Sequence, residues 1–111
     1  MSLGTRREPN DYITTLRDVL RNSKSVVVRR SAAEQIASSP QSVSIPILRE
    51  MMQLETDPYI IQQGIRVVGI PQNSQVILNR MELLIQQPGA TEDVKKDAQA
   101  VIQQIREKQK P

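Results

Sequence analysis

Aliphatic and polar positions recur along this chain at intervals of 33 residues. Residues 28–32 read Val-Arg-Arg-Ser-Ala, residues 61–65 read Ile-Gln-Gln-Gly-Ile, and residues 94–98 read Val-Lys-Lys-Asp-Ala. In each copy the first and last residues stand four apart, which places them one above the other on a helix face. The pattern therefore predicts three equivalent helices, with Val28, Ile61 and Val94 buried at equivalent places.

A second series of helices is predicted between these three. Leu16, Leu48 and Met81 are related by steps of 32 and 33 residues, and their apolar neighbours follow the same steps. Three first helices should therefore alternate with three second helices. We expect them near residues 10–22, 25–38, 41–54, 58–69, 73–87 and 91–108.

Residues that start and stop helices agree with these boundaries. Asp57 before Pro58 is an N-cap with proline at the first helical position, and Ser39 with Pro40 offers the same pair. Asn73 and Thr91 are suitable caps for the two remaining starts, and Gly69 and Pro88-Gly89 mark helix ends. Pro46 either kinks the third helix or marks its true start.

The polar turn and helix at residues 21–36 resemble the second helix of a HEAT repeat, which has Val-Arg, two variable residues, Ala and a late aliphatic. The resemblance covers residues 9–108. It implies an all-α fold of the armadillo-like type, a right-handed α-solenoid of three HEAT-like helical hairpins. One domain would span residues 9–108, with repeats near 9–38, 40–70 and 73–108, a disordered tail at 1–8 and a short tail at 109–111.

The family often carries an Asp in the turn within a repeat, and this Asp pairs with the Arg of Val-Arg to form a ladder between repeats. Here the position of Arg29 becomes Gln62 and then Lys95, and no Asp precedes them at a fixed offset. We therefore expect the ladder to be absent.

The composition argues against an enzyme. The chain has no His and no Cys, so the usual general base, thiolate nucleophile and soft-metal ligands are missing. Asp93 and Asp97 stand four apart, but acids in a first helical turn favour the helix dipole, and we interpret them as structural. We expect no catalytic residue, cofactor or metal. No apolar stretch of bilayer-spanning length and no signal-peptide core is present, which makes a cytoplasmic location the expectation.

A protein-binding or scaffold module is the function that the sequence favours. Solenoids of this resemblance bind partners on the face built by their second helices. The expected binding residues are those recurring at equivalent polar positions there: Arg29, Arg30, Gln62, Gln63, Arg66, Lys95, Lys96 and Gln99. We expect Arg29 and Arg30 to be exposed. Residues 1–30 hold seven basic and three acidic side chains, which favours an acidic partner protein.

Two other functions stay open. Some HEAT-like proteins, including alkylpurine DNA glycosylases, hold DNA along a basic concave face, and Arg29, Arg30, Arg66, Lys95 and Lys96 could contact phosphates. However, aromatic residues for base stacking are not interleaved with them, since the chain has only two Tyr and no Phe or Trp. Phycobilin lyases and phycobilisome-associated proteins also contain HEAT-like repeats, although no residue here identifies a pigment site.

Overall fold

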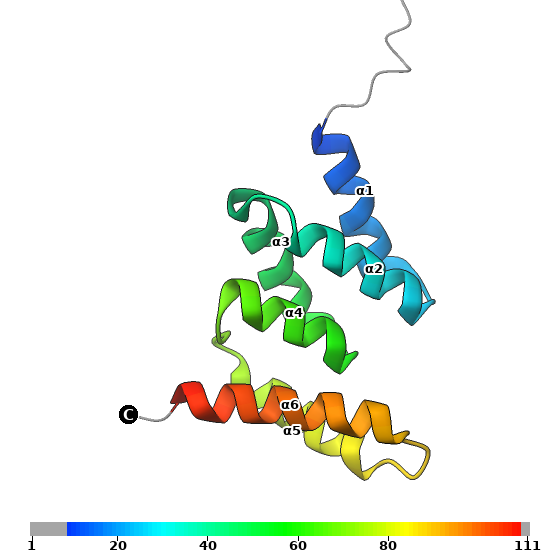
Figure 1. Cartoon of the computed structure of the whole chain (residues 1–111), viewed down its shortest axis with the longest axis vertical. Helices are drawn as coiled ribbons and strands as arrows, with labels where there is room; N and C mark the ends of the chain where they lie inside the picture. Colours follow the sequence, from blue (N-terminus) through cyan, green and yellow to red (C-terminus); the bar gives the residue numbers. More distant parts are fainter. Residues whose placement is uncertain (1–8, 110–111) are drawn as a thin grey trace, which may run out of the picture.

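A computed structural model describes residues 9–109, and this part of the chain consists of six α-helices without a strand (Figure 1). The helices are α1 (Pro9–Asn22), α2 (Val26–Ala37), α3 (Gln41–Leu54), α4 (Pro58–Val68), α5 (Ser74–Gln86) and α6 (Glu92–Gln109). The all-α prediction is confirmed, and each predicted boundary lies within one residue of the observed one. The predicted tails at residues 1–8 and 110–111 lie outside the described residues, and residue 109 belongs to α6.

Side-chain caps start α2, α4 and α6. Ser25, Asp57 and Thr91 each accept a hydrogen bond from the backbone N–H three residues further along the chain. The predictions for Asp57 and Thr91 are therefore confirmed. The prediction for Ser39 is wrong, because Pro40 itself occupies the N-cap position of α3 and the helix begins one residue later. Asn73 occupies the N-cap of α5, but its side chain makes no capping bond.

Helix α3 continues through Pro46, so the alternative that it starts at this proline is wrong. The backbone N–H groups of Val43 and Ser44 both donate to the carbonyl of Pro40, which closes the first turn ahead of Pro46. Pro46 lies in the following turn with its ring exposed to solvent. The proline therefore removes one hydrogen-bond donor of α3 without ending the helix.

Consecutive helices pack in pairs, α1 on α2, α3 on α4 and α5 on α6. Between pairs, α2 packs on α4 and α4 packs on α6, whereas α1 makes a smaller contact with α3, and α3 and α5 make little or none. In Figure 1, α2, α4 and α6 accordingly follow one another down the molecule, with α3 and α5 behind them. The second helices are thus the more continuous layer.

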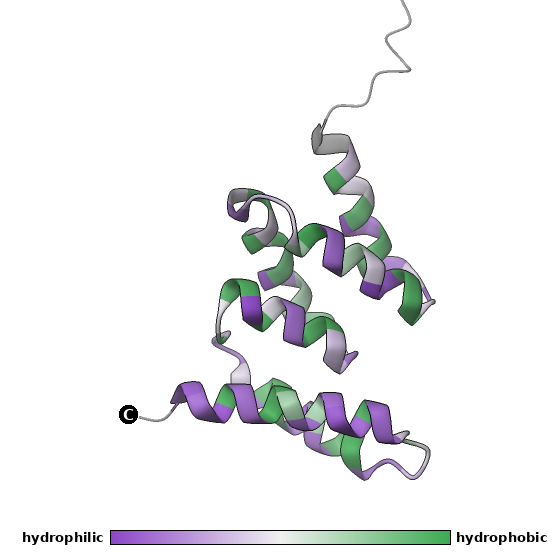
Figure 2. Ribbon diagram, in the orientation of Figure 1, coloured by the Kyte–Doolittle hydropathy of each residue, from purple (hydrophilic) through white to green (hydrophobic). Residues whose placement is uncertain are grey.

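Aliphatic side chains fill the space between the layers. Leu16, Leu48 and Met81, the equivalent positions of the first helices, are all buried, as the sequence pattern predicts. Figure 2 shows that α3 is largely hydrophobic, whereas α6 is largely hydrophilic on the side that faces the viewer. The core of the described residues is aliphatic throughout, because neither Tyr12 nor Tyr59 is buried in it.

The predicted equivalence of Val28, Ile61 and Val94 is wrong. Ile61 is fully buried, Val94 is half-buried, and Val28 is 46% exposed. The capping bonds give the correct frame, since the backbone N–H groups that donate to the caps belong to Val28, Ile60 and Val94. The middle helix is therefore displaced by one residue from the 33-residue step.

In this corrected frame each second helix carries a small residue seven positions after its cap: Ala32, Gly64 and Ala98. Ala32 and Ala98 are buried, and Gly64 lies against α3. A Cβ at Gly64 would stand 2.7 Å from Sδ and 2.8 Å from Cγ of Met52, which is itself fully buried. The absence of a side chain at Gly64 therefore allows α4 to approach α3 closely.

Candidate partner-binding surface

The outward sides of α2, α4 and α6 form the surface on which the sequence predicts a partner; we call it the second-helix surface. On α4 it consists of Tyr59, Gln62 and Arg66, which stand three and four residues apart and are the least buried of the first nine residues of that helix. On α6 it includes Lys96, which is exposed and lies opposite the buried stripe of Ala98 and Val101.

Three of the predicted residues, Gln62, Gln63 and Arg66, belong to α4. The side-chain amide of Gln62 donates to the backbone carbonyl of Asp97 on α6 at 3.0 Å. Arg66 donates to the amide oxygen of Gln63 at 2.6 Å, and Gln63 is itself buried. Gln62 and Arg66 therefore reach the second-helix surface, whereas Gln63 serves to hold Arg66 in place.

The other two residues predicted on α6, Lys95 and Gln99, have neighbours on α5 and α6. Lys95 is within 3.8 Å of the Glu92 carboxylate on its own helix. Gln99 borders a groove between α5 and α6, together with Ile85 and Ile102. Of the three predicted residues on α6, Lys96 and Gln99 are exposed, whereas Lys95 is half-buried.

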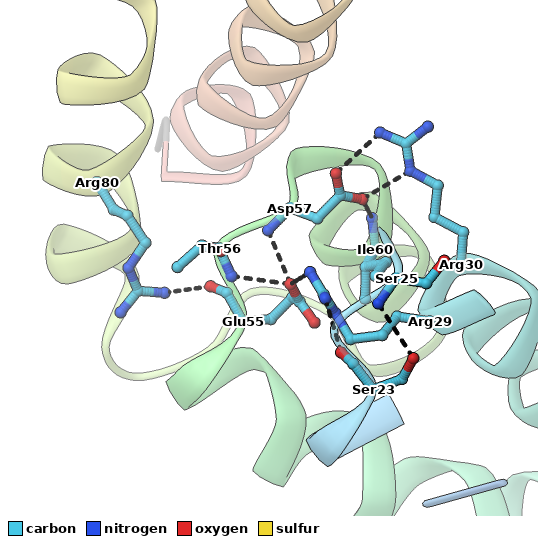
Figure 3. A network of polar contacts seen from close by, with 9 residues as sticks. All are labelled: Ser23, Ser25, Arg29, Arg30, Glu55, Thr56, Asp57, Ile60 and Arg80. Carbon is cyan, nitrogen blue, oxygen red and sulfur yellow. Dashed lines mark hydrogen bonds and ion pairs between the residues drawn. The ribbon is translucent and has the colours of Figure 1, made fainter. Parts of the chain in front are cut away.

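The prediction that Arg29 and Arg30 are exposed is wrong, because both side chains bind acidic residues beyond α3 (Figure 3). Arg29 is 18% exposed; it donates to the backbone carbonyl of Ser23 at 3.0 Å and to the Glu55 carboxylate at 3.4 Å. Arg30 is 32% exposed and donates two hydrogen bonds to the Asp57 carboxylate, at 2.9 and 2.8 Å. These contacts tie α2 to the next helix pair.

The bond between Arg30 and Asp57 is an Arg–Asp contact between two helix pairs that the sequence pattern does not predict, although a single contact is not the recurring ladder of the family. It is made by the residue after Arg29 and by the N-cap of α4. The hydrogen bonds to Asp57 raise the pKa of Arg30 above its ordinary value, against the opposing effect of burial. The Arg30 guanidinium also stands 5.2 Å from the centre of the Tyr59 ring, within the range of a cation–π contact.

Glu55 and Arg80, which no pattern in the sequence singles out, complete this network (Figure 3). One oxygen of the Glu55 carboxylate accepts hydrogen bonds from the backbone N–H groups of Thr56 and Asp57, at 2.9 and 2.8 Å. Arg80 of α5 donates to the backbone carbonyls of Glu55 and Gln53, at 2.6 and 3.3 Å. The loop at residues 55–57 is thus bonded to α2 and α5 as well as to α4.

Neither a metal-type cluster nor a membrane-crossing helix is found in the described part of the chain. Within residues 9–109, Asp and Glu side chains do not gather in groups of three or more that could hold a metal ion. No helix in the same range is long and apolar enough to cross a bilayer.

Comparisons with protein-family models, with curated proteins and with solved structures find no match to this chain.

Proposed function

We propose that this chain is a small right-handed α-solenoid of three HEAT-like hairpins and serves as a protein-binding or scaffold module. The observation that carries the proposal is the continuous contact from α2 through α4 to α6, set against the sparse contacts among α1, α3 and α5. Closer spacing of the second helices curves a stack toward their side, which gives a concave face for a partner.

Features shared by α2, α4 and α6 support the interpretation of the chain as three repeats. Their caps at Ser25, Asp57 and Thr91 use the same hydrogen bond, and each helix has a small residue seven positions later. Three units are about the minimum for a stack of this kind, because one pair of helices cannot bury its own apolar face.

The chemistry of the second-helix surface favours a polypeptide as partner. Its centre presents a ring and an amide, Tyr59 and Gln62, with cations at Arg66 and Lys96. Tyr and Arg are enriched where proteins bind one another, because each combines a large contact area with directed hydrogen bonds. The two cations would select a partner segment that carries Asp or Glu.

The contacts of the other basic residues weaken the nucleic-acid alternative. Arg29 and Arg30 are bound to Glu55 and Asp57, and Lys95 lies beside Glu92, so three of the five cations considered for phosphates have acidic partners. The described residues offer one aromatic ring on this surface, Tyr59, and Arg30 already stands against it. No structural observation favours a pigment-related role.

The test is capture of a partner by the immobilised protein from the organism that encodes it, with identification of the retained protein by mass spectrometry. We expect a retained protein whose capture is lost with the double variant Gln62→Ala and Arg66→Glu. It should persist with Arg49→Glu, which places the same charge change on an exposed position of α3. Capture that is equal with both variants would contradict the proposed surface.

A parallel titration with duplex DNA separates the two functions. We expect weak binding near physiological salt, with a dissociation constant above about 1 μM and no sequence preference, as for non-specific phosphate contacts. Tight binding that depends on sequence and survives higher salt would instead make this a nucleic-acid-binding protein.

A further inference from the structure

A pocket of about 260 Å³ lies between the C-terminal halves of α1 and α3, away from the second-helix surface. Its charged lining comes from Arg17 and Arg21 of α1, Arg29 of α2, Glu50 of α3 and Glu55 just after α3. Its apolar lining consists of Leu20, Ile47, Met51 and Leu54. Arg29, predicted for the second-helix surface, thus lines this pocket instead.

The three arginines of the pocket differ in how closely acidic side chains bind them. Glu55 is bound to Arg29 and to two backbone N–H groups, so its hydrogen bonds lie within the protein. Arg17 donates to both oxygens of Glu50 at 3.1 Å. Arg21 stands 3.6 Å from that same carboxylate, beyond hydrogen-bond distance. The Glu50 carboxylate therefore lies between two guanidinium groups and is hydrogen-bonded to Arg17. The N–H groups of Arg21 remain available to a ligand at the edge of the pocket.

An aliphatic wall lies beside Arg21. Leu54, the last residue of α3, is 65% exposed and borders the pocket next to Met51 and Ile47. An exposed leucine beside an incompletely bound arginine presents two kinds of contact together, one for an apolar side chain and one for a carboxylate. Planar bidentate hydrogen bonding makes arginine the preferred cation for a carboxylate.

The volume limits what the pocket can take. Sites for small molecules usually measure about 300–1,000 Å³, so this pocket is small for a cofactor and suits one or two side chains. We propose that it binds a partner polypeptide through an aliphatic side chain next to a Glu or Asp, with the carboxylate on Arg21 and the aliphatic group against Leu54. This site is separate from the second-helix surface and does not depend on the function proposed for it.

The experiment is a nuclear magnetic resonance titration of the whole chain with the probe N-acetyl-Leu-Glu-Leu-amide. The expected result is a set of shifted backbone amides at the pocket residues, with a dissociation constant of about 1 mM, which corresponds to about 4 kcal/mol. The probe with Gln in place of Glu should bind about tenfold more weakly, because it loses a charge-assisted pair. Glutarate, a free acid without an aliphatic side chain, should bind more weakly still.

Three variants complete the test. Arg21→Ala and Leu54→Ala change side chains that are more than half exposed, so both proteins should fold, and each should weaken the Glu probe severalfold. Arg49→Ala removes an exposed cation of α3 outside the pocket and should leave binding unchanged. Equal affinity for the Glu and Gln probes, shifts centred on α4 and α6, or no shifts at all would each overturn the proposal.

Discussion

The guanidinium of Arg30 donates two hydrogen bonds to the carboxylate of Asp57, and the same carboxylate caps the first turn of α4. Two stabilising roles therefore meet in one side chain, that of a helix cap and that of an anchor for the preceding helix pair. Because Asp57 is buried and Arg30 is mostly covered, removing one partner of this pair should cost more than breaking an ordinary surface ion pair.

Replacing Asp57 by alanine and, separately, by asparagine should distinguish its role as helix cap from its role as the partner of Arg30. Asp57→Ala removes the cap, worth about 1 kcal/mol, and leaves Arg30 without its partner, for a total loss of about 2–4 kcal/mol. Asp57→Asn keeps a good capping residue and one acceptor for Arg30, and should cost about 1 kcal/mol less. Urea unfolding gives both values, and equal losses would show that the charge and not the cap dominates.

The double variant Arg29→Ala and Arg30→Ala should destabilise the fold, contrary to the expectation from sequence. It leaves the buried carboxylates of Glu55 and Asp57 without their cations, at a cost of about 2–4 kcal/mol. The matched control is Arg49→Ala with Lys96→Ala, which removes two exposed cations and should change stability by less than about 1 kcal/mol. Similar melting temperatures for the two double variants would argue that the network is dispensable.

Gly64→Ala should destabilise the protein although alanine is the better helix former. The added methyl group would stand less than 3 Å from Sδ and Cγ of the fully buried Met52, so overpacking should cost about 1–3 kcal/mol. Gly89→Ala adds the same group with no atom within 4 Å and should be neutral within about 0.5 kcal/mol. Thermal unfolding compares the two, and a stabilised Gly64→Ala would refute the close approach of α4 to α3.

The corrected frame predicts different costs at equivalent positions. Ile60→Ala creates a cavity in the core and should cost about 2–4 kcal/mol, whereas Val28→Ala removes a side chain that is nearly half exposed and should cost less than about 1 kcal/mol. Ile61→Asp buries a carboxylate and should cost about 3–5 kcal/mol. A large loss at Val28 would mean that another surface covers it in solution.

Helix positions could be predicted from the sequence because caps and breakers act locally. Asp57 with Pro58 and Thr91 start helices through bonds to atoms three residues away, and no distant contact is needed. The spacing between the caps of α2, α4 and α6 could not be predicted to the residue. The caps are 32 and then 34 residues apart, and these two steps average to 33, so a fixed step matched the outer helices and missed the middle one by one position.

The hydrogen bonds among Arg30, Asp57, Glu55 and Arg80 could not be predicted from the sequence for a different reason. Arg30 and Asp57 are 27 residues apart, and Arg80 and Glu55 are 25 apart, so the pairs exist only once the helices pack. The available signal was the position of Asp57 as cap of the following second helix, since a carboxylate there lies close to the preceding second helix. The sequence pattern instead predicts that Arg29 and Arg30 are exposed, because they stand at recurring polar positions of the second helices.

The hydrogen bonds at residues 55–57 have a consequence for how the molecule opens. Stacked helical pairs touch only their neighbours, and such arrays commonly fray from their ends one pair at a time. Here the short loop at residues 55–57, within the α3–α4 pair, is bonded to α2 through Arg30 and to α5 through Arg80. The same loop therefore connects all three helix pairs. Slow amide protons of α2, α4 and α5 should therefore exchange through one common global opening, and loss of Asp57 should let the α1–α2 end open separately and more easily while the bonds of Arg80 to α5 remain.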